Sequence, residues 1–187
     1  TGADDSNITN GTVSGNTAAL EGGGLWNGTG TMTVDGTIID ANTASGAAAN
    51  EGGGGIFNAG GTLTVMNATI TNNIADGASG SGGGILNDMG TLTVTDTELS
   101  GNSSRRAGGG IEVASGGNLL TLTNVDLLNN STASAPGNGG GLHITGADDS
   151  NITNGTVSGN TAALEGGGLW NGTGTMTVDG TIIDANT

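Results

Sequence analysis

The sequence contains no cysteine, lysine or tyrosine, and its only basic residues are Arg105 and Arg106. Without cysteine, neither a disulfide framework nor a thiolate metal site can form. Seventeen acidic residues give a formal net charge of −15. Such a charge repels phosphate backbones, so we expect no nucleic-acid partner. No apolar run approaches the roughly 20 residues of a spanning helix, so we also expect no membrane insertion.

Aromatic residues are almost as scarce, with two Trp and one Phe beside 41 Gly. By composition alone such a chain would be classed as disordered. The order of the residues indicates otherwise, because GGGLWNGTGTMTVDGTIIDAN at 22–42 is followed by GGGIFNAGGTLTVMNATITNN at 53–73, with each residue class kept. Self-similarity at a period near thirty is typical of a solenoid, in which each unit stacks on the one before.

Every unit contains three short segments with the period of a strand and none with that of a helix. An aliphatic residue follows each glycine run, an apolar pair that alternates with threonine comes next, and a third segment ends on asparagine. Alternation of period two marks a strand with one buried face. We therefore predict an all-β, right-handed, three-sided parallel β-helix of about six and a half coils, with the right hand taken from general connection rules and from the resemblance described below.

The asparagines that close the third segment recur once per coil. An amide both donates and accepts hydrogen bonds, so stacked asparagines can bond to one another along the axis and satisfy backbone groups at the corner. We predict such a structural ladder at Asn16, Asn42, Asn73, Asn102, Asn130, Asn160 and Asn186. Asn102 also begins the triplet NSS, so a glycan site is the alternative there.

After each of these asparagines comes a segment of variable length rich in Ala, Ser and Gly. We expect these segments, at 43–51, 74–81, 103–107, 131–138 and 161–165, to be loops at one corner of the coil. Loops gathered on one edge of a solenoid often form its interaction surface, and the alternative is that they are tolerated surface variation.

Residues 1–43 are repeated without a change at 145–187, an offset of 144 residues. Perfect identity indicates recent duplication, gene conversion or design, since substitutions on a solenoid surface are mostly tolerated. We interpret residues 1–187 as a single β-solenoid segment taken from a tandem array of 144-residue super-repeats. We expect it to continue in a longer chain or to stack end to end with copies of itself.

The glycine runs and the asparagine-ending segments resemble the GGA[ILV] and FxxN motifs of bacterial β-helix surface proteins, including the chlamydial polymorphic outer-membrane proteins. GGGL or GGGI at 22–25, 82–85, 108–111 and 139–142 are similar to the first motif. Here Gly replaces the Ala, and Ile, Leu or Val replaces the Phe. The resemblance implies a right-handed coil in an extracellular stalk or adhesin, and it implies no reaction.

Three aromatic residues, Trp26, Phe57 and Trp170, follow the inward residue of their coil and are expected to point outward. Leu86, Glu112 and His143 are expected at the equivalent place in the coils between. Exposed aromatics can stack on sugars or on a neighbouring fibre, so these three are possible surface contacts, and extracellular glycans are possible partners.

A ladder of T-x-T pairs is expected to face outward, as on the ice-binding faces of some antifreeze proteins. Its members are Thr31 with Thr33, Thr62 with Thr64, Thr91 with Thr93, and Thr121 with Thr123. It breaks at Asp149 and Asn151. Threonine is also simply a favoured strand residue.

Neither a catalytic nor a metal-binding constellation emerges from the motifs. His143 is the only histidine, and no EF-hand or calcium-binding nonapeptide is present. We expect no cofactor. The alternative is calcium bound by the adjacent carboxylates of Asp4 and Asp5 and of their duplicates Asp148 and Asp149. We also expect no enzyme, because polysaccharide cleavage on a β-helix needs a Lys or Arg base or paired acids, and adjacent strand residues face opposite ways.

Together these features predict a structural segment of a long, acidic, secreted or cell-surface fibre, filament or adhesin stalk. Its partners would be copies of itself, end to end or laterally. The alternatives are a glycan-binding adhesin surface and an ice-binding T-x-T face.

Overall fold

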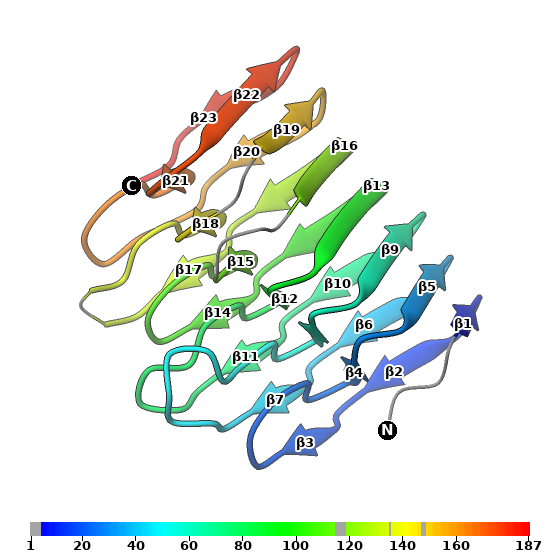
Figure 1. Ribbon diagram of the computed structural model, residues 1–187. Coiled ribbons are helices and arrows are strands. Elements are labelled where there is room, and N and C mark those ends of the chain that lie inside the picture. Colours follow the sequence, from blue (N-terminus) through cyan, green and yellow to red (C-terminus); the bar gives the residue numbers. More distant parts are fainter. Residues whose placement is uncertain (1–4, 115–118, 135, 147–148) are drawn as a thin grey trace.

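A computed structural model describes residues 5–114, 119–134, 136–146 and 149–187. Within this range every regular element is a strand, and every pairing between strands is parallel. The strands stack coil on coil into a β-solenoid of about six turns (Figure 1). The predicted all-β, three-sided architecture is therefore confirmed, while the right hand stays a prediction.

Sheet A carries two of the three predicted strands of each coil, which meet at a bend. Its first column is β1 (Asp5–Thr9), β5 (Thr31–Asp35), β9 (Thr62–Met66), the first halves of β13 (Thr91–Ser100) and β16 (Leu119–Leu128), β19 (Asp149–Thr153) and β22 (Thr175–Asp179). Its second column is β2 (Thr12–Ser14), β6 (Ile38–Asp40), β10 (Thr69–Thr71), the second halves of β13 and β16, β20 (Thr156–Ser158) and β23 (Ile182–Asp184).

Sheet C carries the segment that follows each glycine run. It consists of β4 (Leu25–Asn27), β8 (Ile56–Ala59), β12 (Ile85–Asp88), β15 (Ile111–Val113), β18 (Leu142–Ile144) and β21 (Leu169–Asn171).

The third side, sheet B, was expected to be loop. It consists of two-residue strands directly after the ladder asparagines: β3 (Thr17–Ala18), β7 (Thr43–Ala44), β11 (Ile74–Ala75), β14 (Ser103–Ser104) and β17 (Ser131–Thr132). These strands are too short to show a period in the sequence, and only the stacked neighbours that share their hydrogen bonds make them strands.

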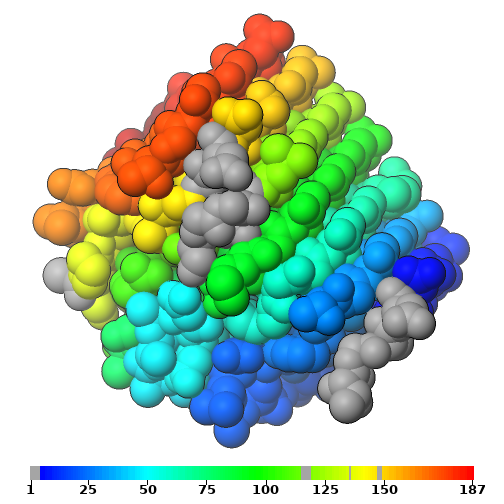
Figure 2. All heavy atoms as spheres, viewed as in Figure 1, coloured from blue at the N-terminus to red at the C-terminus, as the bar shows by residue number. Residues whose placement is uncertain are grey.

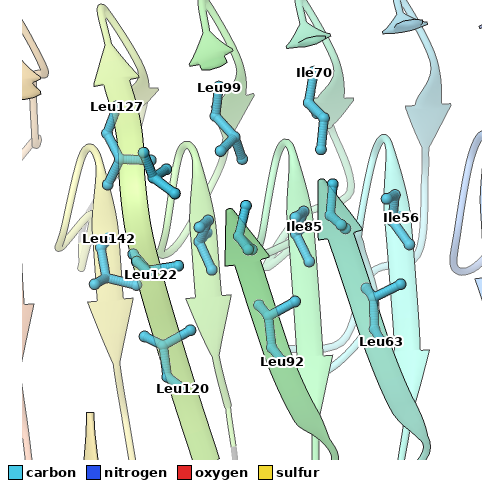
Figure 3. Packing of buried hydrophobic residues seen from close by; sticks show 14 of the residues in the cluster. Ile56, Leu63, Ile70, Ile85, Leu92, Leu99, Leu120, Leu122, Leu127 and Leu142 are labelled. Carbon is cyan, nitrogen blue, oxygen red and sulfur yellow. The ribbon is translucent and has the colours of Figure 1, made fainter. Parts of the chain in front are cut away.

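The core is a set of aliphatic columns, because in-register parallel pairing places each inward side chain on its equivalent in the next coil. Met32 lies on Leu63, Leu63 on Leu92, and Leu92 on Leu120. Similar columns run from Ile39 and from Leu25. These side chains meet in the centre of the coil (Figure 3), where they are fully or almost fully buried over the middle coils.

The glycine run of each coil is required by close approach of the backbone at the corner between sheets B and C. Gly53 has a φ of +63°, a left-handed conformation that glycine adopts without strain. A Cβ on Gly54 would lie 2.5 Å from the carbonyl oxygen of Gly83, and one on Gly55 would lie 2.6 Å from that of Gly84. Any side chain here would hold the coils apart.

The core column of sheet A that contains Met32 and Leu63 is interrupted by a polar residue. Ser150 lies between Leu120 and Met176 in the core, and its buried hydroxyl has no hydrogen-bond partner. A buried hydroxyl without a partner destabilises the folded state. Its duplicate Ser6 occupies the first coil, where it is only partly buried.

We predict that Ser150→Ala raises the free energy of unfolding by about 1 kcal/mol, because it removes the unpaired hydroxyl. The matched change Ser6→Ala should alter it by less than about 0.5 kcal/mol. Urea denaturation of both variants checks this, and equal effects at the two sites would contradict it.

Candidate functional site

The seven predicted ladder asparagines form one column at the corner between sheets A and B. The backbone N–H and the side-chain Nδ2 of each asparagine donate to Oδ1 of the asparagine in the next coil. The six links that join Asn16 to Asn186 measure 2.9 to 3.0 Å. The column therefore runs unbroken from the first coil to the last.

Each interior amide of this ladder also donates to a backbone carbonyl of the preceding coil. Asn102 Nδ2, for example, lies 2.8 Å from the carbonyl oxygen of Ile70 and 3.0 Å from Asn130 Oδ1. The five interior asparagines are completely buried. An amide that is fully bonded and shielded from water is not available to a ligand or a glycan, so Asn102 is not a glycan acceptor in the folded chain.

A second asparagine column, which the sequence analysis missed, lies at the corner between sheets C and A. Asn27 Nδ2 donates to Asn58 Oδ1 at 2.7 Å, and Asn58 Nδ2 donates to Asn87 Oδ1 at 2.6 Å. Val113 and Ile144 then replace the asparagine, both buried. In the sequence, this column is indicated by an asparagine two residues after the inward aliphatic residue of each sheet C strand. That asparagine is present in only four of the six strands.

The outer face of sheet C contains the predicted surface aromatics in the expected alignment. Trp26, Phe57, Leu86, Glu112, His143 and Trp170 occupy one register position in successive strands. Phe57 points outward as predicted, but it is not exposed, because it is buried against Leu86 and Ala114. Trp26 is 47% exposed, and Trp170 is partly buried.

Each tryptophan donates a hydrogen bond to the glutamate five residues before it. Trp26 Nε1 donates to Glu21 Oε2 at 3.2 Å, and Trp170 Nε1 donates to Glu165 Oε2 at 3.1 Å. The Trp26 ring stacks on Phe57 with centroids 6.4 Å apart, and the Trp170 ring stacks on His143 at 4.2 Å. The column thus holds one tryptophan at each end and a covered middle.

Between the tryptophans lies a cluster of charged side chains, formed by Arg106, Glu112 and His143, that no sequence motif predicted. Glu112 is fully buried, and its Oε1 accepts hydrogen bonds from Arg106 Nη2 at 3.2 Å and from Thr145 Oγ1 at 2.9 Å. Its Oε2 lies 2.6 Å from His143 Nδ1. A buried carboxylate is stable only when it is paired and hydrogen-bonded in this way.

Arg106 extends the cluster toward earlier coils. Its Nε donates to Ser81 Oγ at 3.0 Å, and its Nη2 lies 3.4 Å from the carbonyl oxygen of Ala49. One side chain therefore ties together segments that are far apart in sequence. The sequence analysis placed this arginine in a loop and could not locate its partners, because they come from other coils.

The hydrogen bonds of this cluster join residues of different coils, so we call it the structural lock. Thr145 Oγ1 lies 3.3 Å from His143 Nδ1, the same nitrogen that faces the carboxylate. The described residues contain no pocket beside it and no group of three or more His, Cys, Asp and Glu side chains that could hold a metal ion. Of the suggested calcium ligands, Asp5 and Asp149 are exposed, and Asp4 and Asp148 lie outside the described residues.

The predicted T-x-T ladder is correct for three coils and shifted in the fourth. Thr31, Thr62 and Thr91 share one column, and Thr33, Thr64 and Thr93 share the next. Thr121 pairs with Thr93, however, and Thr123 pairs with Thr95, so Leu119 follows Thr91. Register follows the inward pairing of Leu120 with Leu92, which moves the fourth T-x-T pair along by two residues.

Compared with known proteins, the chain matches no protein-family model, and no curated protein or solved structure is significantly similar to it. The evidence for the β-solenoid therefore comes from the structure and not from a relative. The described part of the chain also holds no helix long and apolar enough to cross a membrane.

We predict that Asn160→Ala lowers the free energy of unfolding by about 3 kcal/mol, because Leu127 O and the Asn130 N–H would be buried without partners. Asn16→Ala should cost less than about 1 kcal/mol, since Asn16 is exposed and has the same neighbours in sequence. Denaturant unfolding checks this, and equal losses would show that the ladder contributes little.

Proposed function

We propose that this chain is a structural segment of a long extracellular fibre or adhesin stalk. The observation that carries the proposal is the unbroken asparagine ladder, which runs parallel to three continuous sheets along the axis. Each coil contacts only its neighbours, so such a stack can lengthen without changing its cross-section. The fold is consistent with a structural repeat protein.

Charge and surface chemistry support an assembly that stays dispersed in water. The net charge of −15 keeps separate rods apart laterally. At the bend of sheet A, asparagine amides donate to carboxylates of the preceding coil. Asn67 Nδ2 donates to Asp35 Oδ1 at 2.8 Å, and Asn124 Nδ2 donates to Asp96 Oδ1 at 2.9 Å. These hydrogen bonds join successive coils. Growth along the axis is therefore favoured over lateral clustering.

We expect purified chain to form long filaments of uniform width, with a spacing of about 4.8 Å along the filament axis from stacked strands. Negative-stain electron microscopy and fibre diffraction check this. A solution that holds only short, monodisperse rods at high concentration would overturn self-assembly.

A second candidate function is glycan binding at Trp26. The indole is 47% exposed and lies beside the Glu21 carboxylate. In this arrangement the indole ring can stack on a sugar ring while the carboxylate accepts hydrogen bonds from the hydroxyl groups of the sugar. Trp170 repeats the arrangement, although it is less exposed.

If glycans bind here, Trp26→Ala should weaken retention on a glycan array, and Trp26→Ala combined with Trp170→Ala should abolish it. The exposed Ile74 lies on sheet B, so Ile74→Ala should leave retention unchanged. Equal binding by the wild-type chain and Trp26→Ala would contradict the glycan function and would leave the structural role standing.

A further inference from the structure

The first column of sheet A presents threonines on its outer face. In β5 the inward residues Met32 and Val34 are buried, so the residues that alternate with them face outward. The same alternation in β9, β13 and β16 aligns one outward threonine per coil in register. This middle rank consists of Thr33, Thr64, Thr93 and Thr121.

A rank of three further threonines lies on either side of the middle rank. These are Thr31, Thr62 and Thr91 on one side, and Thr95, Thr123 and Thr153 on the other. We call the three ranks together the threonine patch, a band that crosses β5, β9, β13, β16 and β19, which lie side by side in Figure 1. Each of these five strands is paired on both sides, so the patch lies within the stack and not at either end of it.

The hydroxyl groups of the patch are open to water. None of these threonine side chains is buried, and none has a hydrogen-bond partner within the described part of the chain. Inward threonines of the same sheet differ, because the buried Thr37 and Thr97 donate to backbone carbonyls, Thr97 to that of Thr95 at 2.8 Å. The patch hydroxyls therefore keep their capacity to donate and accept hydrogen bonds outside the fold.

Parallel stacking arranges these hydroxyls as a regular grid. Register partners repeat about every 4.8 Å along the axis, and alternate residues of one strand lie about 6.6 Å apart. Threonine is β-branched and therefore stiff at χ1, so each side chain holds one hydroxyl and one methyl group in a restricted orientation. The grid is thus set by the fold before any ligand arrives, which lowers the entropic cost of binding.

The chemistry of the patch suits a periodic ligand better than a single small molecule. The aromatic residues Trp26, Phe57 and Trp170 all belong to sheet C, and the nearest acids, Asp35 and Asp149, border the patch. What the patch offers is a repeat of hydroxyl and methyl groups in two directions. Hydroxyls can hold ordered water, and methyl groups between them confine it, on a scale comparable to the repeat of oxygen atoms in ice.

We propose that the threonine patch binds the surface of ice. Waters held on the grid join the ice lattice, and the bound chain then blocks growth of the crystal face that it covers. The inference goes beyond the proposed structural role and does not depend on filament formation. Its measurable consequence is thermal hysteresis, a freezing point that lies below the melting point of the same crystal.

Two substitutions in one coil test the location of the site. Thr64 lies in the middle rank, between Thr33 and Thr93, whereas Thr69 lies outside the patch, on the second column of sheet A between Ile38 and Glu98. Both are partly exposed, and tyrosine is a favoured strand residue, so both variants are expected to fold. Circular dichroism and the denaturation midpoint check this.

We expect the wild-type chain to show thermal hysteresis in a nanolitre osmometer and to shape the ice crystals. Thr64→Tyr should lose most of the hysteresis, because the ring lifts the ice surface off the grid, and Thr69→Tyr should keep it. Equal losses in the two variants would overturn the assignment of the site to the patch.

A gain-of-function variant gives a readout that misfolding cannot produce. Asn151 interrupts the middle rank between Thr121 and Thr177, and Asp149 precedes Thr175 in the adjacent rank. Asp149→Thr combined with Asn151→Thr should raise the hysteresis above that of the wild type, because it extends the patch onto β22. An unchanged or lower value would contradict the grid as the binding element.

Two further outcomes would overturn the proposal. Wild-type chain without hysteresis is the first, and filaments seen by electron microscopy in the same sample would leave the structural role standing. Retention on crystalline cellulose without hysteresis, lost in Thr64→Tyr, is the second, because it would assign the patch to a crystalline polysaccharide instead.

Discussion

Parallel, in-register stacking along one axis is the constraint on which the whole structure depends. Every residue must accept its equivalent about 4.8 Å above and below it. Aliphatic side chains do so by packing, as in the column from Leu25 to Leu169, and asparagines do so by bonding amide to amide. Glycine does so by having no side chain where backbones meet. The described coils are therefore stacked without helices, and without disulfides because the chain has no cysteine.

Charged residues satisfy the same constraint with more difficulty. On the exposed bend, carboxylates accept hydrogen bonds from asparagine amides of the next coil. On the outer face of sheet C, the buried Glu112 is instead paired with Arg106 and lies against His143. This lock departs from the regular pattern, because the second asparagine column is interrupted by Val113 and Ile144 in the two coils that supply Glu112 and His143. The space-filling view shows the successive coils as parallel rows of atoms that lie side by side (Figure 2).

Sequence reasoning succeeded where one residue type recurred at one place in each coil. The strands of sheets A and C and the aliphatic core followed from alternation and from the glycine runs. It failed where a feature depended on partners from other coils. The two-residue strands of sheet B have no period, the cover over Phe57 comes from its neighbours on the sheet, and the shift of Thr121 reflects the inward pairing of Leu120.

The sequence by itself determined the stack: its repeat length, its inward residues, the positions of its asparagines and the identity of its two 43-residue segments. These are local, repeated properties, and a repeat needs no long-range information to be read. Only the tertiary structure decided which surface residues are covered and that Arg106, Glu112 and His143 meet. The physical reason is that burial and pairing belong to the neighbours of a residue, and in a solenoid those neighbours lie about thirty residues away.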